Sequence, residues 1–500
     1  MAKPKQFTKP PKKQKPKAAE PETADEFQEA ADFEEETGGK WRAGDPAKAG
    51  RAFVRALEVY DKGLQKYSGN FDLAYNKARL ELEITQQSSL VAHIGLPLID
   101  LLKQTLDSHR FALRLNEQNP DVLFNTSQVL TSLAEQLSES GDSETPVTLL
   151  HEALELLSAC LSRQEMVLEQ QQTALEDAEE GGVPLEADDK PAAESTGEPA
   201  ANNDADDPGQ YATIENAVTF NDLLDTVHAS LTALTTLVAL VDPTSLQTLG
   251  DMANSLSEKK APIYLEKVPE DAREAARFDL AVDRANFIAA FADAQYNALA
   301  LELTDYVARL DAFHIPGKEQ NATALGAEAE ARTELATSVM AQYEDEPGLP
   351  ADVCWKQLGF AQELYARATR LENSAQLCLS RADVEMLRHR IANMPDVKIS
   401  DGIRKSSPTL AQNAQTYYKG AIRLAGGADA DLKTKAQQRL FIVTQMRKVL
   451  YGAEPAADLA QLVDFSKAQA GMHECLMECI EEGLLGAEQA EELATRVLAG

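Results

Sequence analysis

The sequence predicts an all-α fold in which helices stack into a solenoid. Apolar residues recur at steps of three and four through most of the 500 residues, which is the period of a helix with one buried face. Short breaks rich in Pro and Gly separate segments of helix length, and no segment alternates as a strand would. A short motif also recurs at a fixed spacing. Together these observations predict helices packed on helices.

The net charge of the chain limits the classes of partner that it is expected to bind. It is −33, from 81 acidic and 48 basic residues. A nucleic-acid binder needs a basic face to neutralise phosphates, so this balance argues against nucleic acid for the chain as a whole. The charge instead favours a basic protein partner, or serves solubility.

Cysteine usage and hydropathy bear on the compartment. The five cysteines are odd in number and widely spread, which is typical of reduced thiols in a cytoplasmic or nuclear protein. No apolar run opens the chain, so we expect no signal peptide. The longest apolar stretch, 231–241, is too short to span a bilayer, and we expect no membrane association.

Residues 1–21 are predicted to form a disordered basic tail. The run from Pro10 to Lys17 holds three prolines and four lysines. Proline blocks helix formation and like charges repel, so this run should stay unfolded. The tail is either a nuclear-localisation or RNA-contacting arm, or simply a solvated end.

Residues 22–174 are predicted to form the first set of helical repeats. Helix signals begin near Thr23, break over 38–46, and resume with a strongly amphipathic helix through Phe53 and Tyr60. Further helices are expected at 71–87, 96–116, 121–139 and 145–174.

Residues 175–210 change the character of the chain. This segment carries twelve carboxylates against one lysine and almost no large apolar residue. It cannot bury enough surface to offset the entropy of ordering, and we expect a disordered acidic linker. It is either a lure for a basic client or a solvated insertion.

Residues 211–500 are predicted to form a second set of helical repeats. Pro- and Gly-containing breaks near positions 242, 268, 315, 347, 394 and 426 divide this region into helix-length segments.

One motif recurs inside the predicted helices. The heptapeptide 70–76, Asn-Phe-Asp-Leu-Ala-Tyr-Asn, matches 119–125, Asn-Pro-Asp-Val-Leu-Phe-Asn, 49 residues later. A weaker echo lies at 293–297. The Asp at the start of the following helix is expected to cap it or to complement its dipole, and the aromatic residue can wedge between neighbouring helices. A helix pair of this kind buries its apolar face by stacking on the next pair.

The motif resembles the junction between tetratricopeptide (TPR) repeats. Trp355-Lys356-Gln357-Leu358-Gly359 resembles the opening of the first helix of such a repeat, and Ala414, Tyr418 and Ala421 resemble the pattern of its second helix. The spacing exceeds the roughly 34 residues of the family. The chain is also similar in fold and charge to fungal TPR-like proteins and to dedicated ribosomal-protein chaperones.

The resemblance nominates residues for two roles. It implies that the asparagine after each aromatic residue points into a groove and bonds the backbone of a bound peptide; alternatively, it caps or bridges helices. These groove residues are Asn76, Asn125 and Asn297. The resemblance assigns packing between repeats to Tyr75, Phe124, Tyr296, Trp355, Gly359 and Tyr418.

Some chemistry is not expected. A domain that clamps the tail of Hsp70 or Hsp90 needs basic residues one turn apart after the groove asparagine, and 121–137 holds no Lys or Arg. Cys475 and Cys479 share a helix face, but His473 points elsewhere, so a buried thiol pair is favoured over a metal site. We find no catalytic or cofactor-binding grouping and predict no enzyme, no metal and no cofactor.

The sequence therefore leads to an interaction protein. The first hypothesis is a TPR-like scaffold, adaptor or dedicated chaperone for a basic client, such as a ribosomal or nucleic-acid-binding protein. The alternative is a structural subunit of a larger assembly. Nucleic acid is expected to bind at most through the basic tail.

Overall fold

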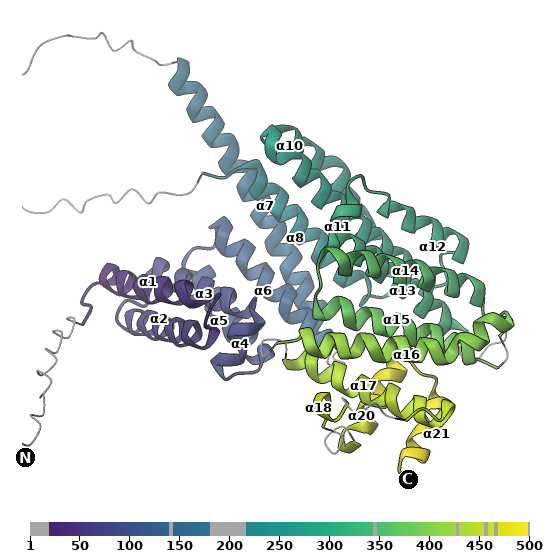
Figure 1. The fold of residues 1–500 in the computed structure, drawn as a ribbon. Coiled ribbons are helices and arrows are strands. Elements are labelled where there is room, and N and C mark those ends of the chain that lie inside the picture. Colours follow the sequence, from purple (N-terminus) through teal and green to yellow (C-terminus); the bar gives the residue numbers. More distant parts are fainter. Residues whose placement is uncertain are drawn as a thin grey trace, which may run out of the picture. The chain divides into compact units, whose positions relative to one another are not determined.

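The computed structural model describes residues 20–139, 144–180, 217–343, 348–395, 397–426, 430–454, 459–464 and 469–498. Within these ranges the chain forms helices and turns without a strand, which confirms the predicted all-α class (Figure 1). Most of the predicted basic tail, and positions 181–210 of the predicted acidic linker, lie outside the described residues. The chain divides into two compact units, residues 1–116 and 117–500.

The first unit has a single core beneath five helices. Phe27, Phe53, Tyr60 and Leu73 are among its buried members. Side-chain caps open three of the helices, since Thr23 forms a capping box and both Asp45 and Asn70 accept a backbone N–H. In chain order the helices are α1 (Ala24–Trp41), α2 (Pro46–Lys66), α3 (Phe71–Thr85), α4 (Ser88–Ile94) and α5 (Leu98–Leu115).

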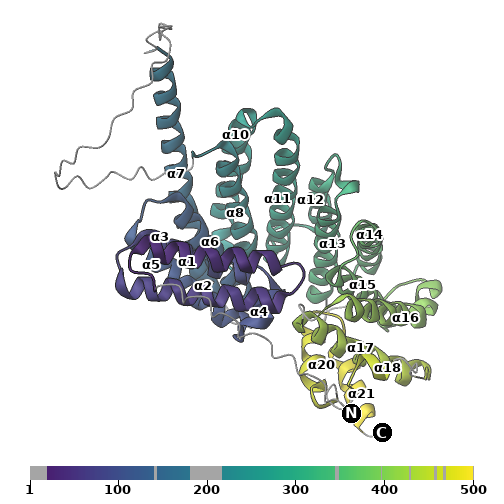
Figure 2. The same cartoon turned by 60° about the vertical axis from the view of Figure 1, so that its left-hand side comes forward.

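The second unit is a stack of two helix layers. In its first layer each helix contacts the next member of the same layer, and Figure 2 shows α8, α11 and α13 side by side. The helices of this first layer are α6 (Pro120–Glu139), α8 (Phe220–Val238), α11 (Glu270–Asn297), α13 (Ala322–Gln342), α15 (Ala375–Asn393) and α17 (Ala430–Tyr451).

The second layer packs on the first. Its long helices each contact two members of the first layer: α7 contacts α6 and α8, α14 contacts α13 and α15, and α16 contacts α15 and α17. Helices at the end of the chain pack on α17. The remaining helices are α7 (Glu144–Glu180), α9 (Leu246–Asn254), the π-helical turn η2 (Ser255–Lys260), α10 (Ala261–Lys267), α12 (Leu303–Arg309), α14 (Ala351–Leu371), α16 (Asp401–Leu424), α18 (Leu459–Leu462), α20 (Met472–Glu481) and α21 (Ala487–Leu498).

The predicted domain boundary at 175–210 is wrong. The units divide after Asn116, and α7 and α8, which flank the acidic segment, contact each other inside the second unit. Helix α7 also continues to Glu180, six residues past the predicted start of the linker. The acidic segment is therefore an insertion between neighbouring helices, because packing of α7 on α8 does not depend on the residues that join them.

Two other predicted boundaries shift. Helix α1 runs through Gly38 and Gly39, where a break was expected. Gly38 is buried, and a Cβ there would lie 2.4 Å from the Phe53 ring, so the glycine serves close packing of α1 on α2. The short helix α4 was not predicted.

The repeated motif opens equivalent helices in two of its three copies. Asn70 accepts the N–H of Leu73 at 2.9 Å, and Asn119 accepts the N–H of Val122 at 3.1 Å, so the first residue of each motif is a helix cap. The third copy is not equivalent. Residues 293–297 end α11, so this echo does not mark a repeat junction.

The two TPR-like helix patterns do not describe one regular repeat. The pattern of a first helix lies on α14 and the pattern of a second helix lies on α16, yet both helices belong to the second layer. The structure thus shows a helical-repeat stack with irregular repeats.

Candidate protein-binding face

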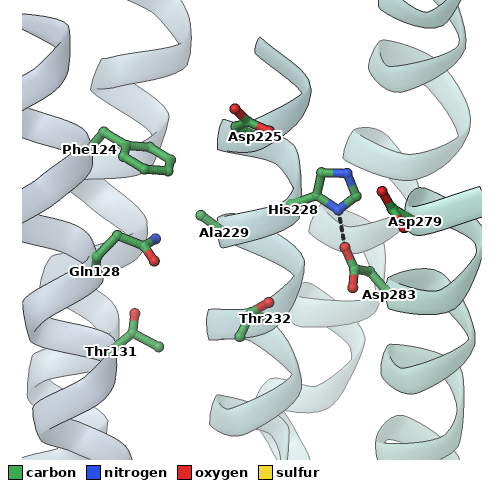
Figure 3. A pocket seen from close by; sticks show the side chains of 9 residues that line it. All are labelled: Phe124, Gln128, Thr131, Asp225, His228, Ala229, Thr232, Asp279 and Asp283. Carbon is green, nitrogen blue, oxygen red and sulfur yellow. Dashed lines mark hydrogen bonds and ion pairs between the residues drawn. The ribbon is translucent and has the colours of Figure 1, made fainter. Parts of the chain in front are cut away.

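The first layer of the second unit holds two pockets. One, here called the α8 pocket, measures about 450 Å³ and is lined by α6, α8 and α11 (Figure 3). The other, here called the α13 pocket, measures about 690 Å³ and is lined mainly by α13 and α15, with contributions from α11, α17 and α20. We call the first-layer surface that carries both pockets the acidic face.

Carboxylates dominate the α8 pocket. Asp225 projects from α8, whereas Asp279 and Asp283 project from α11, one turn apart (Figure 3). Asp225 and Asp279 are exposed, and neither forms an ion pair with a described residue. Desolvation by the surrounding protein raises the pKa of Asp225, against the opposing effect of His228.

A histidine lies among these carboxylates. His228 Nδ1 is bonded to the carboxylate of Asp283 (Figure 3). Burial opposes a charge on the ring, but the hydrogen bond and charge of Asp283, with Asp225 and Asp279 nearby, raise the pKa of His228 above its ordinary value. The pocket thus already attracts positive charge.

The α13 pocket holds a second group of carboxylates. Glu330 and Glu334 lie one turn apart on α13, and neither is paired with a cation among the described residues. Both side chains are exposed to solvent but surrounded by protein, since they lie inside a groove. Desolvation raises the pKa of Glu330, and desolvation with the charges of Asp293 and Glu330 raises the pKa of Glu334 to about 7.

Polar neighbours hold Asp293 beside these glutamates. Tyr306 Oη donates to Asp293 Oδ1 at 2.9 Å, and Asn297 Nδ2 donates to Asp293 Oδ2 at 2.9 Å. Desolvation nonetheless raises the pKa of Asp293, against the opposing effect of these hydrogen bonds. The negative charges of Asp293 on α11 and Glu330 on α13 thus both act on Glu334.

Two cations at the far end of the α13 pocket are already engaged. Arg439 is 3% exposed and bonds Asp383 Oδ2 at 2.5 Å and the carboxylate of Glu482. Lys435 lies 2.8 Å from Glu482. Arg439 and Lys435 are thus paired with Asp383 and Glu482. Neither cation forms an ion pair with Glu330 or Glu334.

The three asparagines that the TPR resemblance nominated are not brought together. Asn76 belongs to the first unit, where its Nδ2 donates to Gln28 Oε1 at 3.1 Å and bridges α3 to α1. Asn125 lies on α6, one residue after Phe124 of the α8 pocket. Asn297 is exposed and lines the α13 pocket.

The nominated packing residues differ in their surroundings. Tyr296 and Tyr418 are buried, Tyr75 stacks on Phe71, Phe124 lines the α8 pocket, and Trp355 is half-buried. Around Gly359 no atom lies within 4 Å of the position a Cβ would take. Its predicted role in close packing therefore has no contact to support it.

Sequence reasoning missed the carboxylates of the acidic face. A signal for them exists, because Asp279 and Asp283 and also Glu330 and Glu334 are like charges at i, i+4, which destabilises a helix by about 0.2–0.5 kcal/mol per pair. The proximity of Asp293 to Glu334 could not be predicted from this spacing, because it depends on how α11 packs on α13.

Potential metal ligands do not cluster in the described part of the chain. No group of three potential metal ligands occurs there. Cys475 and Cys479 are both buried while His473 is exposed, as their positions on the helix predicted. No described helix combines the length and apolarity needed to cross a bilayer.

Comparisons with known proteins give limited similarity. No family model matches the chain. UPF0656 protein C926.02 of Schizosaccharomyces pombe is 32% identical over 130 residues, which cover 26% of this chain and 28% of that protein. The match therefore spans less than a third of the relative's length.

Solved helical proteins resemble the chain only loosely. The S. pombe nuclear import adaptor Nro1 is 14% identical, with a TM-score of 0.28 over 79% of this chain and 99% of that chain. A circular tandem repeat protein is 14% identical, with a TM-score of 0.25 over 95% of this chain and 96% of that chain. At these TM-scores the helices are placed differently, so neither structure carries an argument about function.

Proposed function

We propose that this chain is a protein-binding adaptor or dedicated chaperone whose acidic face holds a basic segment of its client. The observation that carries the proposal is a set of carboxylates that line the two pockets and form no ion pair with a described residue: Asp225, Asp279, Glu330 and Glu334. A ribosomal or nucleic-acid-binding protein fits as client, because such proteins carry segments rich in Lys and Arg that need shielding.

The energetics of the face favour a cationic ligand. Desolvation, and then the charges of Asp293 and Glu330, raise the pKa of Glu334, so its ionised form is disfavoured in the groove. An ammonium or guanidinium placed between these carboxylates would offset the repulsion and form charge-assisted hydrogen bonds in a partly desolvated groove. Complementary charge also speeds the encounter of the two proteins.

Finer assignments belong to the same proposal. We keep the TPR-like character of the stack, with Asn125 and Asn297 as contacts to a bound backbone. We also propose a location in the cytoplasm or nucleus, no enzymatic activity, and no binding of Hsp70 or Hsp90 tails.

The alternative is that the chain is a structural subunit of a larger assembly. In that case other proteins would cover both of its helix layers. This alternative predicts that the isolated chain is unstable and co-purifies with its neighbours in fixed stoichiometry. A client-binding adaptor should instead be stable alone and release its partner as salt rises.

Neutralisation of the α13 pocket tests the proposal. A fluorescein-labelled peptide rich in Lys and Arg would be titrated with the wild type and with the Glu330→Gln/Glu334→Gln double variant. We expect the variant to bind about tenfold more weakly or worse, because desolvated charge pairs contribute about 1.5 kcal/mol or more each. The matched control is Glu270→Gln/Glu274→Gln, an exposed pair with the same spacing at the other end of α11.

Equal loss of affinity in both double variants would show a general charge effect and no binding at the face. Affinity purification at low and at moderate salt would then identify the natural client. Recovery of acidic or neutral partners that ignore salt would contradict a basic client. Unchanged binding after deletion of residues 181–210 would exclude the acidic insertion as a lure.

A further inference from the structure

Residues 351–451 form a basic region in an acidic chain. This stretch holds 16 Lys and Arg against 9 Asp and Glu, although the whole chain has a net charge of −33. It covers α14 to α17. Three of these basic residues, Lys356, Arg381 and Arg388, line one groove together with the two carboxylates Glu363 and Glu385.

The groove lies on the side of α15 away from the acidic face. It measures about 540 Å³, with α14 and α16 of the second layer as its walls and α15 behind them. Three basic and three aromatic side chains line it: Lys356, Arg381, Arg388, Trp355, Phe360 and Tyr417. We call it the basic groove.

Helix α15 presents different charges to its two sides. Arg381, Glu385 and Arg388 follow one another at helical spacing and line the basic groove. Asp383 and Leu387 belong to the opposite stripe of the same helix and line the α13 pocket. Arg390 lines the α13 pocket as well, so the two grooves lie on opposite sides of α15 and carry different sets of charged groups.

Aromatic rings hold the guanidinium groups of the basic groove in place. Arg388 Cζ lies 4.5 Å from the centroid of the Trp355 ring, and Arg381 Cζ lies 4.2 Å from that of Tyr417. Such cation–π contacts orient a guanidinium. Arg381 Nη2 also donates to Tyr417 Oη at 2.9 Å. Arg388 Nη1 lies 3.6 Å from Glu385 Oε1, which offsets part of its charge. The Nε–H groups of both arginines lack an acceptor among the described residues. Lys356 is exposed and has no carboxylate partner there.

The floor of the groove also lacks a partner. Glu385 is 2% exposed; its Oε1 accepts Gln362 Nε2 at 2.5 Å, while its Oε2 has no donor among the described residues. Gln362 Oε1 is likewise buried and unpartnered. Buried polar atoms in this state cost about 1–3 kcal/mol each, so a ligand that brings N–H donors would stabilise the floor.

We propose that the basic groove docks an acidic segment of a second protein. Such a segment offers carboxylates to Lys356, Arg381 and Arg388 at the rim and backbone N–H groups to the floor. A simple anion has no donor for Glu385 and would be repelled by it. This inference goes beyond the proposed function, since it gives the chain a second partner on another face.

Nucleic acid fits the groove less well. The chain repels phosphate through its overall charge. Bases need free aromatic faces on which to stack, but guanidinium groups already lie over the rings of Trp355 and Tyr417.

Gly359 provides a way to block the groove without disturbing the fold. It borders the groove on α14, and a Cβ there meets nothing within 4 Å. Gly359→Glu would place bulk and negative charge in the groove, whereas Gly359→Ala adds a single methyl group and serves as the matched control. Both substitutions favour the helix, so circular dichroism should be unchanged.

The test uses the full chain and a fluorescein-labelled peptide rich in Asp and Glu, followed by fluorescence anisotropy. We expect binding by the wild type and by Gly359→Ala, and affinity about tenfold lower or worse in Gly359→Glu. Binding of a Lys- and Arg-rich peptide should stay the same in both variants, which keeps this test separate from that of the acidic face.

Three outcomes would overturn the proposal. The peptide could bind Gly359→Glu as well as the wild type. A single-stranded DNA of equal charge could bind the wild type more tightly than the peptide and lose affinity in Gly359→Glu. Finally, the peptide could bind only after residues 181–210 are deleted, which would make the chain's own acidic insertion the occupant.

Discussion

The ionisation of Glu334 should make ligand binding at the acidic face depend on pH. The pKa of Glu334 is raised from 4.5 to about 7 by desolvation and by Asp293 and Glu330, so the residue is partly protonated near neutral pH. A bound cation favours the ionised form and lowers the pKa again. Binding of a basic segment must therefore release protons and strengthen as pH rises.

We predict that a Lys- and Arg-rich peptide binds several-fold more tightly at about pH 8 than at about pH 6, because Glu334 then needs no deprotonation. Isothermal titration calorimetry at both pH values, in buffers of different ionisation enthalpy, measures the affinity and the protons released. In Glu334→Gln both the pH dependence and the proton release should shrink. The same pH slope in wild type and variant would contradict the prediction.

The pH dependence of folding stability tests the raised pKa of Glu334 independently of ligand binding. A carboxyl whose pKa is higher in the folded than in the unfolded state loses stability as pH rises from about 4.5 to about 7. Glu334→Gln removes this loss, so its melting temperature should exceed that of the wild type above pH 7 and approach it in acid.

At the scale of single residues, the sequence predicts which residues share a helix face, but it does not predict their tertiary neighbours. The i, i+4 pair of Glu330 and Glu334 is visible in the sequence, as are the capping asparagines at 70 and 119. The hydrogen bonds that hold Asp293 come from Tyr306 and Asn297, and their geometry depends on the turn after α11. The neighbours that perturb Glu334 are thus a product of tertiary packing.

At the scale of elements, glycine pairs show how closely helices pack. Gly38 and Gly39 are adjacent in α1, yet a Cβ at Gly38 would lie 2.4 Å from the Phe53 ring while one at Gly39 meets nothing within 4 Å. Sequence reasoning placed a helix break here, since two glycines disfavour a helix. Packing of α1 on α2 outweighs that preference.

Gly38→Ala should destabilise the first unit by about 1–3 kcal/mol, because α1 must move away from Phe53. Gly39→Ala should instead stabilise it by about 0.5–1 kcal/mol, through helix propensity alone. Urea unfolding followed by circular dichroism measures both. If the two alanines behaved alike, close contact of α1 with α2 at this point would be wrong.

Helices α15, α16 and α17 are tied by a buried charge network. Tyr418 Oη donates to Asp383 Oδ1 at 2.6 Å, and Arg439 joins Asp383 to Glu482. Burial raises the pKa of Asp383 even so, because desolvation exceeds the favourable effect of Arg439. Removal of the cation would leave a buried carboxylate without a counter-charge.

Arg439→Met should accordingly destabilise the second unit by about 3–5 kcal/mol. Lys435→Met removes a cation from the same Glu482, but the Lys435 side chain is 43% exposed, and its loss should cost at most about 1 kcal/mol. Thermal unfolding of both variants measures the two losses of stability. Comparable small losses would mean that the network contributes little.

At the scale of the whole molecule, the division into units differs from the division by composition. The acidic segment looks like a linker because it lacks large apolar residues, and positions 181–210 of it lie outside the described residues. Which helices pack across it cannot be inferred from composition. Contact between α7 and α8 places residues on both sides of it in one unit.

Proteolytic cleavage within 181–216 should therefore leave the two fragments associated. They should elute together from a size-exclusion column in native buffer and separate in denaturant, because α7 and α8 bury apolar surface against each other. A replacement of 181–210 by a short Gly/Ser linker serves as control and should keep the melting temperature of the wild type. Separation of the fragments without denaturant would favour two independent domains.

Helix α15 has a consequence for how two ligands would influence each other. Its opposite stripes line the α13 pocket and the basic groove, so a cationic and an anionic segment would be held about one helix diameter, roughly 10 Å, apart. That separation is close to the Debye length of about 8 Å at physiological ionic strength, so part of their mutual attraction survives. Each ligand would then tighten the other by the same factor, as thermodynamic reciprocity requires, and added salt would uncouple them.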